Sequence, residues 1–257
     1  MKNRFLLILL SISMLFGVIS CSGGEGSGST SGNLSESVRT PKGYYYTAIL
    51  GDSITDRKTN KDIITEHYTD YLYDNCSFIE NIQNLGYGGS CIAGLKDKAN
   101  KVSPSFIERC DQISEKANLI IVFGGTNDFG ISPNPLGDPA DETAETFYGG
   151  LKILIDMIEE AHPAAKLVFV TPLFRKDQGL PELPSTNRYG NSLDQYAAAI
   201  KETCEKRNIG CIDAFNELTE LNAVTCDDYE VDGLHLNNEG NILLGQFLAK
   251  KLAEILD

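Results

Sequence analysis

The chain reads Tyr44-Tyr45-Tyr46-Thr47-Ala48-Ile49-Leu50 and then Gly51-Asp52-Ser53-Ile54, and this stretch decides the fold. The apolar run predicts the first buried strand of a domain, because short apolar runs are typical of strands covered on both faces. Ser53 follows directly, so we expect it on a turn at the edge where α/β sheets bind ligands. The other interpretation is a helix N-cap, for which Asp and Ser are preferred.

Apolar runs and helical patterns alternate after this strand. The runs predict strands at Tyr45–Leu50, Ser77–Leu85, Leu119–Phe123, Lys166–Val170 and Cys211–Phe215. Strands that alternate with helices predict an α/β fold in which helices cover both faces of a parallel sheet. No internal repeat or second domain is indicated.

Helical periodicity fills the segments between the strands. Apolar residues from Phe147 to Ile158 share one face of a helix that ends near His162. Ser192 and Gln195 form a capping box for a helix that runs to about Arg207. A further helical stretch is expected at Ile63–Leu72, and an amphipathic helix closes the chain from about Leu244.

The N-terminus predicts export. Residues 1–20 combine a short basic start with an uncharged apolar stretch, as in a signal peptide. The ending Val18-Ile19-Ser20-Cys21 resembles the lipobox of bacterial lipoproteins, which implies lipidation of Cys21; an ordinary signal peptide is the alternative. Residues 21–40 then form a flexible Gly/Ser tether, and 41–257 the folded domain. The expected location is exported and membrane-anchored, periplasmic or at the cell surface.

Charge and cysteine content narrow the partners. The formal net charge of −14 argues against nucleic acid as a partner and leaves the lipid anchor as the expected membrane contact.

Six cysteines follow Cys21, and an even count in an exported chain favours some disulfide over six free thiols. No close-spaced pair typical of a zinc site is present in the sequence, so no metal is expected. The six are Cys76, Cys91, Cys110, Cys204, Cys211 and Cys226.

Only one of the three histidines stands in a catalytic context. His162 precedes a proline at a predicted helix end, and His67 falls in a helical stretch, so both are expected to be structural. His235 follows Asp232 by three residues, and this offset can place a carboxylate beside the imidazole. The alternative for this segment is an ordinary turn with a helix cap at Asn237.

Two segments could stabilise an oxyanion. Asn84-Leu85-Gly86-Tyr87-Gly88-Gly89-Ser90 follows the second strand, and its glycines allow backbone N–H groups to approach a ligand. Gly124-Gly125-Thr126-Asn127-Asp128 follows the third strand and offers the Asn127 amide. Two long polar loops, Phe129 to Asp141 and Phe174 to Asn191, leave the same edge; they are binding loops or plain surface.

Four segments follow one another along the chain: Gly51-Asp52-Ser53, the glycine turn that includes Gly89, Gly124 to Asp128, and Asp232 to His235. In this order they resemble the blocks of the GDSL, or SGNH, hydrolase family, and the resemblance covers about Tyr44 to Asp257. The resemblance implies a three-layer α/β/α sandwich with a flavodoxin-like five-stranded parallel sheet, without metal or cofactor. It implies that Ser53 is the nucleophile, with His235 and Asp232 completing the triad. The Ser53 N–H, the Gly89 N–H and the Asn127 amide would form the oxyanion hole, with Gly86 or Gly88 as alternatives to Gly89. The first block reads GDSI rather than GDSL, a conservative change.

The expected substrate is a small acyl ester, such as an acetyl group on a carbohydrate, because the loops lean polar and the chain has no tryptophan. The alternatives are a lysophospholipase or thioesterase, and a non-catalytic glycan-binding lipoprotein. Asp52 is expected to stabilise the turn that presents Ser53, rather than to act as the triad acid.

Overall fold

A computed structural model describes residues 44–94, 103–130, 134–176 and 186–257, all of which belong to one compact unit, Val38–Asp257. The predicted signal peptide, Cys21 and the tether lie outside the described residues, as do parts of the two long loops. Within the part that the structure describes, no helix is long and apolar enough to cross a membrane.

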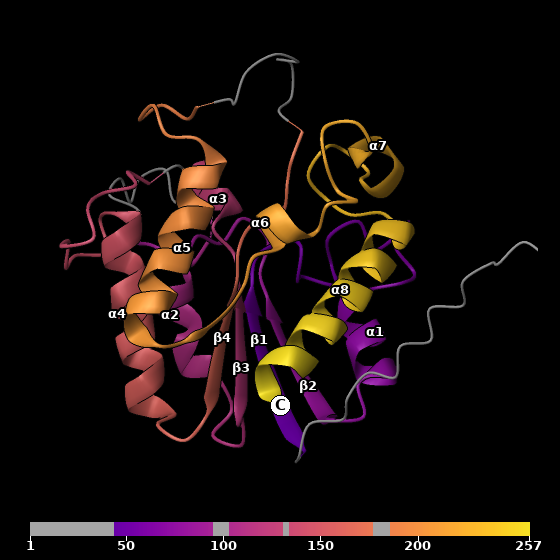
Figure 1. The fold of residues 1–257 in the computed structure, drawn as a ribbon, viewed down its shortest axis with the longest axis horizontal. Helices are drawn as coiled ribbons and strands as arrows, with labels where there is room; N and C mark the ends of the chain where they lie inside the picture. Colours follow the sequence, from indigo (N-terminus) through magenta and orange to yellow (C-terminus); the bar gives the residue numbers. More distant parts are fainter. Residues whose placement is uncertain (1–43, 95–102, 131–133, 177–185) are drawn as a thin grey trace, which may run out of the picture. The chain divides into compact units, whose positions relative to one another are not determined.

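A five-stranded parallel sheet forms the centre of this unit (Figure 1). The strands are β1 (Tyr45–Gly51), β2 (Ile79–Gly86), β3 (Leu119–Phe123), β4 (Lys166–Val170) and β5 (Gly210–Ile212). Their order, β2-β1-β3-β4-β5, is the flavodoxin-like arrangement. The expected fold class is therefore confirmed, and the predicted bounds of β3 and β4 agree with the structure.

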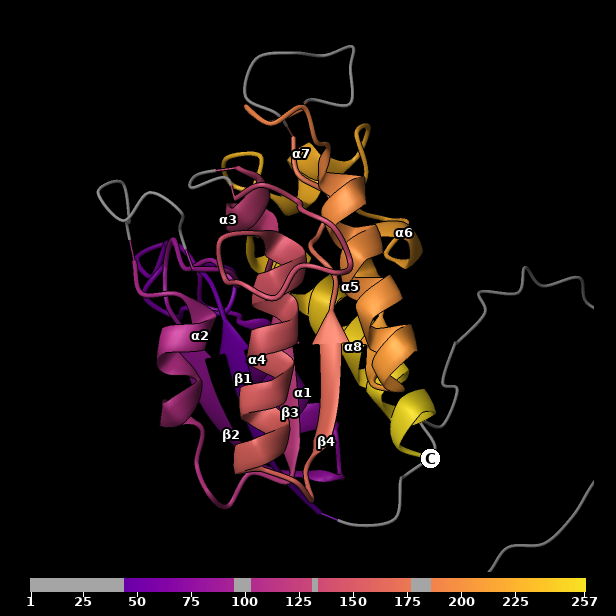
Figure 2. The same ribbon diagram turned by 90° about the vertical axis from the view of Figure 1, so that its left-hand side faces the viewer.

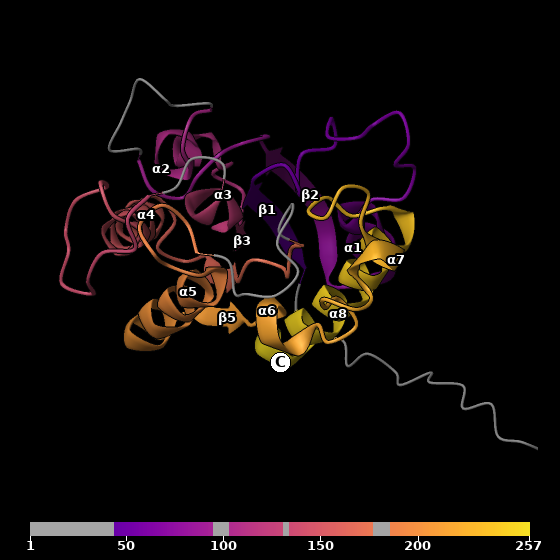
Figure 3. The same ribbon diagram turned by 90° about the horizontal axis from the view of Figure 1, so that it is seen from above.

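Helices cover both faces of the sheet, as Figures 2 and 3 show. One face carries α1 (Tyr68–Asn75) and α8 (Asn238–Leu256), and the other α2 (Phe106–Arg109), α4 (Phe147–Ala161) and α5 (Leu193–Arg207). The short helices α3 (Thr126–Phe129), α6 (Ala214–Glu217) and α7 (Cys226–Tyr229) lie in connections, and a 3-10 turn, η2 (Cys110–Gln112), follows α2.

Two apolar clusters hold the layers together, and the pleat of the strands divides them. Ile49 and Ile121 point to the cluster that contains α1 and α8. Their neighbours Leu50 and Val122 point to the cluster that contains α2, α4 and α5. All four side chains are almost fully buried. Because successive residues of a strand face opposite sides, a continuous apolar strand needs both helical layers.

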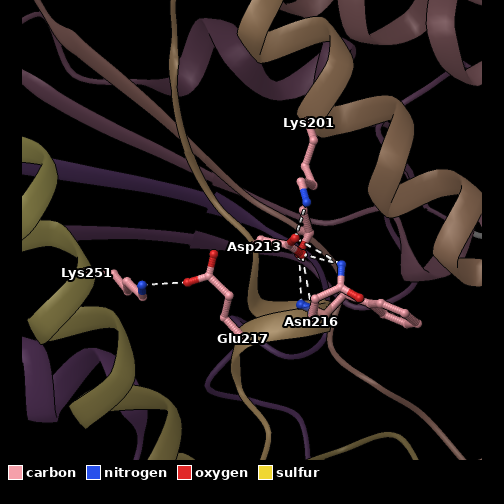
Figure 4. A network of polar contacts seen from close by, with 7 residues as sticks. Lys201, Asp213, Asn216, Glu217 and Lys251 are labelled. Carbon is pink, nitrogen blue, oxygen red and sulfur yellow. Dashed lines mark hydrogen bonds and ion pairs between the residues drawn. The ribbon is translucent and has the colours of Figure 1, made fainter.

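The last strand is shorter than predicted. The sequence favoured a strand through Phe215, but β5 ends at Ile212 because Asp213 caps α6: its carboxylate accepts from the backbone N–H of Asn216 at 3.3 Å. Asp213 also pairs with Lys201 of α5, and Glu217 pairs with Lys251 of α8 at 2.5 Å (Figure 4). These ion pairs join α6 to the helices on both sides.

The helix predicted at Ile63–Leu72 starts later, at Tyr68. The backbone N–H groups of Thr65 and Glu66 donate to the Asn238 side chain at 2.9 and 3.1 Å, which holds this segment out of a helix. His67 is the N-cap of α1, and its ring accepts from the N–H of Thr69. The prediction that His67 lies inside a helix is therefore wrong.

The cysteines differ from the expectation as well. Cys76, Cys110, Cys204, Cys211 and Cys226 are free thiols, so the favoured disulfide is not present among the described residues. Cys76 and Cys226 lie in the α1/α8 cluster and Cys110 and Cys204 lie across the sheet, which excludes pairs between these two groups; Cys204 and Cys211 interact with each other as thiols. Buried there, they pack as small apolar side chains.

Candidate active site

Ser53 lies in a tight turn at the carboxyl end of β1. The Asp52 carboxylate accepts from the N–H of Ile54 at 2.9 Å, which agrees with the expected role of Asp52 in this turn. A Cβ on Gly51 would lie 2.1 Å from the hydroxyl oxygen of Thr55, so only glycine allows the chain to turn back this closely. Ser53 itself is 7% exposed, which leaves its hydroxyl at the edge of a packed region.

His235 lies between Ser53 and Asp232. Its Nε2 is 2.9 Å from the Ser53 Oγ, although 182 residues separate the two in sequence. Its Nδ1 is 2.8 Å from Asp232 Oδ2, and its backbone N–H donates to Asp232 Oδ1 at 2.8 Å. The structure thus brings together all three residues that the sequence put forward, in the order that a serine nucleophile requires.

The turn that carries Asp232 and His235 sits between α7 and α8. Gly233 has a φ of +82°, in the region that favours glycine, and this conformation brings Asp232 back toward His235. Partial burial raises the pKa of Asp232, but hydrogen bonds from the ring and backbone of His235 lower it by more, so the net pKa lies below its usual range. Asp232 is therefore ionised at neutral pH.

The glycine turn after β2 passes beside Ser53. A Cβ on Gly88 would come within 4.0 Å of the Ser53 Cβ. The N–H of Gly86 donates to Asn84 at 2.9 Å, and that of Gly88 donates to Asp56 at 3.2 Å. These two N–H groups already have acceptors, which favours Gly89, with its φ of +74°, as the oxyanion donor among the three candidates.

Asn127 lies on α3, directly after β3. Its side chain is fully buried, and Nδ2 donates to the carbonyl oxygen of Ser90, the residue after Gly89, at 3.0 Å. The amide is therefore tied to the glycine turn and keeps one further N–H. Gly125, with a φ of +107°, is the N-cap of this helix, and a Cβ at this position would lie 3.1 Å from the Pro172 ring.

Asp128 belongs to the motif segment, yet the sequence assigned it no role. Its carboxylate accepts from the N–H groups of Ile92 and Ala93 at 2.8 and 3.0 Å and from Asn134 at 3.0 Å. Burial raises its pKa to about 6, and burial raises that of Asp52 to about 7. Asp52 thus holds the backbone after Ser53, and Asp128, next to Asn127, holds the backbone of Ile92 and Ala93. In the sequence, the position of Asp128 just after a strand was the feature that could have indicated this role.

The segment after β4 carries further residues that the sequence did not single out. Arg175 donates to the backbone carbonyl and the hydroxyl of Thr126, both at 3.2 Å, and so contacts α3. The Lys176 N–H donates to the carbonyl of Gly233 at 2.8 Å, and its ammonium pairs with Asp227. This segment therefore links α3 to the Asp232–His235 turn. No local pattern in the sequence indicated these contacts.

Glu230, two residues before Asp232, is also unanticipated. It is 7% exposed, and neither carboxyl oxygen has a hydrogen-bond partner within the described residues. Burial, together with the nearby carboxylates of Asp232 and Asp227, raises its pKa to about 7. No group of three or more His, Cys, Asp or Glu side chains in the described ranges could hold a metal ion.

The other two histidines make no hydrogen bond to Ser53 within the described residues. His162 is the C-cap of α4, at the helix end where it was expected. His67 borders a small cavity that Ser53 and His235 also line. Burial lowers the pKa of His67 to about 4, so its ring is neutral at physiological pH.

Comparisons with known proteins agree with this geometry. Residues 49–242 match the model of the GDSL-like Lipase/Acylhydrolase family. A crystal structure of a protein from Lactobacillus plantarum is 30% identical, with a TM-score of 0.68 over 84% of this chain and 97% of that chain. A lipase/acylhydrolase from Enterococcus faecalis is 18% identical, with a TM-score of 0.57 over 82% and 96%. A carbohydrate acetylesterase family member from Sinorhizobium meliloti is 15% identical, with a TM-score of 0.56 over 82% and 97%. No curated protein matches the chain.

Proposed function

The chain belongs to the GDSL-like lipase/acylhydrolase family of ester hydrolases, and we propose that Ser53, His235 and Asp232 carry its reaction. The observation that carries this assignment is the continuous contact from Ser53 Oγ through the His235 ring to the Asp232 carboxylate. The same three positions match the family's motif residues in sequence.

In the first half of the reaction, Ser53 Oγ attacks the ester carbonyl while His235 Nε2 takes its proton. Asp232 holds the ring by Nδ1 and stabilises the imidazolium that forms. The tetrahedral intermediate collapses when the imidazolium donates its proton to the leaving alcohol, which leaves the acyl group on Ser53.

In the second half, a water molecule attacks the acyl-enzyme. His235 accepts a proton from this water and returns it to Ser53 Oγ as the acid leaves. In both halves the negative oxygen is held by the N–H groups of Ser53 and Gly89 and by the Asn127 amide. Fixed donors of this kind stabilise the charge without reorganisation during the reaction.

A small acyl group is proposed because the described space beside the nucleophile is small. The cavity next to Ser53 and His235 has a volume of about 20 Å3 and is lined by Ile54, Ile64 and Leu236 among others. This volume holds one water-sized group. A methyl group, as in an acetyl ester, suits it, whereas a long acyl chain does not.

A carbohydrate is proposed as the alcohol part. Tyr87 is 48% exposed and stands two residues before Gly89, so an apolar ring with a polar tip borders the reaction centre. The likeness to the Sinorhizobium meliloti protein supports the fold only. The substrate proposal therefore depends on the site.

Acetate release tests this substrate class. The purified protein is expected to release acetate from acetylated xylan and to prefer acetyl over longer acyl esters of one common alcohol. A preference for chains of about eight carbons or more would contradict it, because such chains need a deep apolar pocket. That result would favour the lysophospholipase or thioesterase alternative.

A non-catalytic glycan-binding lipoprotein is the other alternative. A serine-reactive fluorophosphonate probe separates it from the esterase, because a binder that lacks an activated serine is not labelled. The filled catalytic positions support the esterase.

Lipidation of Cys21 and export of the protein remain part of the proposal, on the strength of the N-terminal sequence. The expected result is that the wild-type protein fractionates with membranes and that Cys21→Ser moves it to the soluble fraction. An unchanged distribution would contradict the lipid anchor.

A further inference from the structure

Arg109 is a buried cation at the centre of the site's framework, and no motif contains it. It is the last residue of α2 and is only 2% exposed. Its guanidinium lies against the rings of Phe106 and Tyr87, with centroid distances of 5.2 and 5.6 Å. A buried charge is costly unless its donors are used, so its hydrogen bonds show what holds it there.

These hydrogen bonds reach three separate segments. One terminal nitrogen donates to the carbonyl of Leu85 at 2.7 Å, near the end of β2. The other donates to the carbonyl of Gly51 at 2.9 Å and to the hydroxyl oxygen of Ser90, also at 2.9 Å. Gly51 stands two residues before Ser53, and Ser90 directly follows Gly89. A single planar group thus sets the β1 turn against the glycine turn.

The third oxyanion donor, the Asn127 amide, is connected to Arg109 through Ser90. The Asn127 amide donates to the Ser90 carbonyl at 3.0 Å, while Arg109 binds the hydroxyl of the same residue. The N–H of Tyr87 also donates to the Gly51 carbonyl, at 3.1 Å, so two of the three partners of Arg109, Gly51 and Ser90, bind a further residue as well. Two of the three proposed oxyanion donors, Ser53 and Gly89, therefore lie next to residues that Arg109 binds, and Asn127 is tied to the same framework through Ser90.

We propose that Arg109 is a positioning residue that fixes the relative placement of the Ser53, Gly89 and Asn127 oxyanion donors. This inference rests on the proposed function. A positioning role predicts a loss in the chemical step, because donors that are displaced by a fraction of an ångström still admit the ester but no longer match the transition state. Lysine keeps the charge but cannot reproduce the planar fork that reaches three acceptors.

The experiment compares kcat and KM for an acetyl ester in the wild type, Arg109→Lys, Ser90→Ala and Ile158→Ala. Ile158 is buried in α4 and serves as a control for lost stability. We expect Arg109→Lys to lower kcat about 10- to 100-fold with KM changed less than about threefold. Ser90→Ala, which removes one acceptor, should lower kcat about 3- to 10-fold. Ile158→Ala should lower the Tm and leave kcat near the wild-type value.

Each outcome decides the inference. If a folded Arg109→Lys variant keeps wild-type kcat, or loses activity only through KM, the inference is wrong. It is also wrong if Ile158→Ala loses as much kcat at equal Tm. Should Arg109→Lys fail to fold, Ser90→Ala decides: a lower kcat supports the inference and an unchanged kcat overturns it. An inactive wild-type protein would instead contradict the proposed function.

Discussion

The backbone N–H of Lys176 donates to the carbonyl oxygen of Gly233 at 2.8 Å, and this contact joins the segment after β4 to the turn between Asp232 and His235. The two residues pack closely: a Cβ on Gly233 would lie 3.1 Å from the Lys176 Cβ. The geometry of the turn from Asp232 to His235 therefore depends on the segment after β4, which is distant in sequence.

Gly233→Ala is expected to disturb this turn. The new Cβ would be strained at a φ of +82° and would also push against Lys176, so we expect a loss of about 1 to 2 kcal/mol in stability and a lower kcat. Gly190→Ala is the matched control, because Gly190 has a φ of +77° but no atom of the described residues lies within 4 Å of its Cβ position. Thermal unfolding and esterase assays on both variants check this. Equal kcat for the two variants would contradict the account.

Asp232→Asn should lower kcat by about 10²- to 10⁴-fold, because a neutral amide no longer stabilises the imidazolium or fixes the tautomer. Asp227→Asn is the control. Asp227 is a nearby carboxylate that pairs with Lys176 at the surface, and we expect its kcat to stay within about threefold of the wild type. Similar losses in both variants would show that general surface charge, and not the contact with His235, is what matters.

The two histidines beside Ser53 can be told apart. His67→Asn should keep kcat within about threefold, because Asn also caps a helix and the neutral ring of His67 makes no contact with Ser53 in the described hydrogen bonds. His235→Asn should lose at least about 10³-fold. Steady-state kinetics decide, and a comparable loss in His67→Asn would mean that the base has been misassigned.

Glu230 predicts a specific pH dependence of stability. Its folded pKa of about 7 lies above the usual Glu value near 4.3, so between these values the folded state binds more protons than the unfolded state. The contribution of this group to the free energy of unfolding should therefore be largest below about pH 4 and be lost as pH rises from about 4 to 7, by on the order of 3 kcal/mol.

Glu230→Gln removes this ionisation, so its unfolding free energy should fall less between pH 5 and pH 8 than that of the wild type. Denaturant unfolding at several pH values measures the difference. Glu239→Gln, a change at an exposed carboxylate nearby, should keep the wild-type slope. Identical slopes for Glu230→Gln and wild type would rule out the raised pKa.

Local patterns predicted the fold, and the resemblance of four segments to the family's motif blocks predicted the residues in contact at the site. The continuous apolar runs at Leu119–Phe123 and Lys166–Val170 gave strands with the observed bounds. The order of the motif segments predicted that Ser53 and His235 act together, and the structure places Ser53 Oγ 2.9 Å from His235 Nε2. The first success follows from parallel strands that end at one edge of a sheet, whereas His235 lies on a turn between α7 and α8 and was paired with Ser53 through the family resemblance.

What the sequence could not show depends on contacts made by distant segments. Arg109 and Glu230 appear as ordinary charged residues in the sequence, and only the packing around them reveals that both are buried. The start of α1 was misjudged for the same reason, because the Asn238 side chain, 173 residues beyond Thr65, binds the preceding backbone. The favoured disulfide was wrong as well, because the sheet separates Cys76 and Cys226 from Cys110 and Cys204, while Cys204 and Cys211 interact as free thiols.

The central claim is that Ser53 is the nucleophile of an ester hydrolase. Its most direct test is fluorophosphonate labelling of the wild type and Ser53→Ala, followed by identification of the labelled peptide, with hydrolysis of an acetyl ester measured in parallel. We predict that the wild type is labelled on Ser53, and that Ser53→Ala is unlabelled and at least about 10³-fold slower. Wild-type hydrolysis by folded Ser53→Ala would contradict the account.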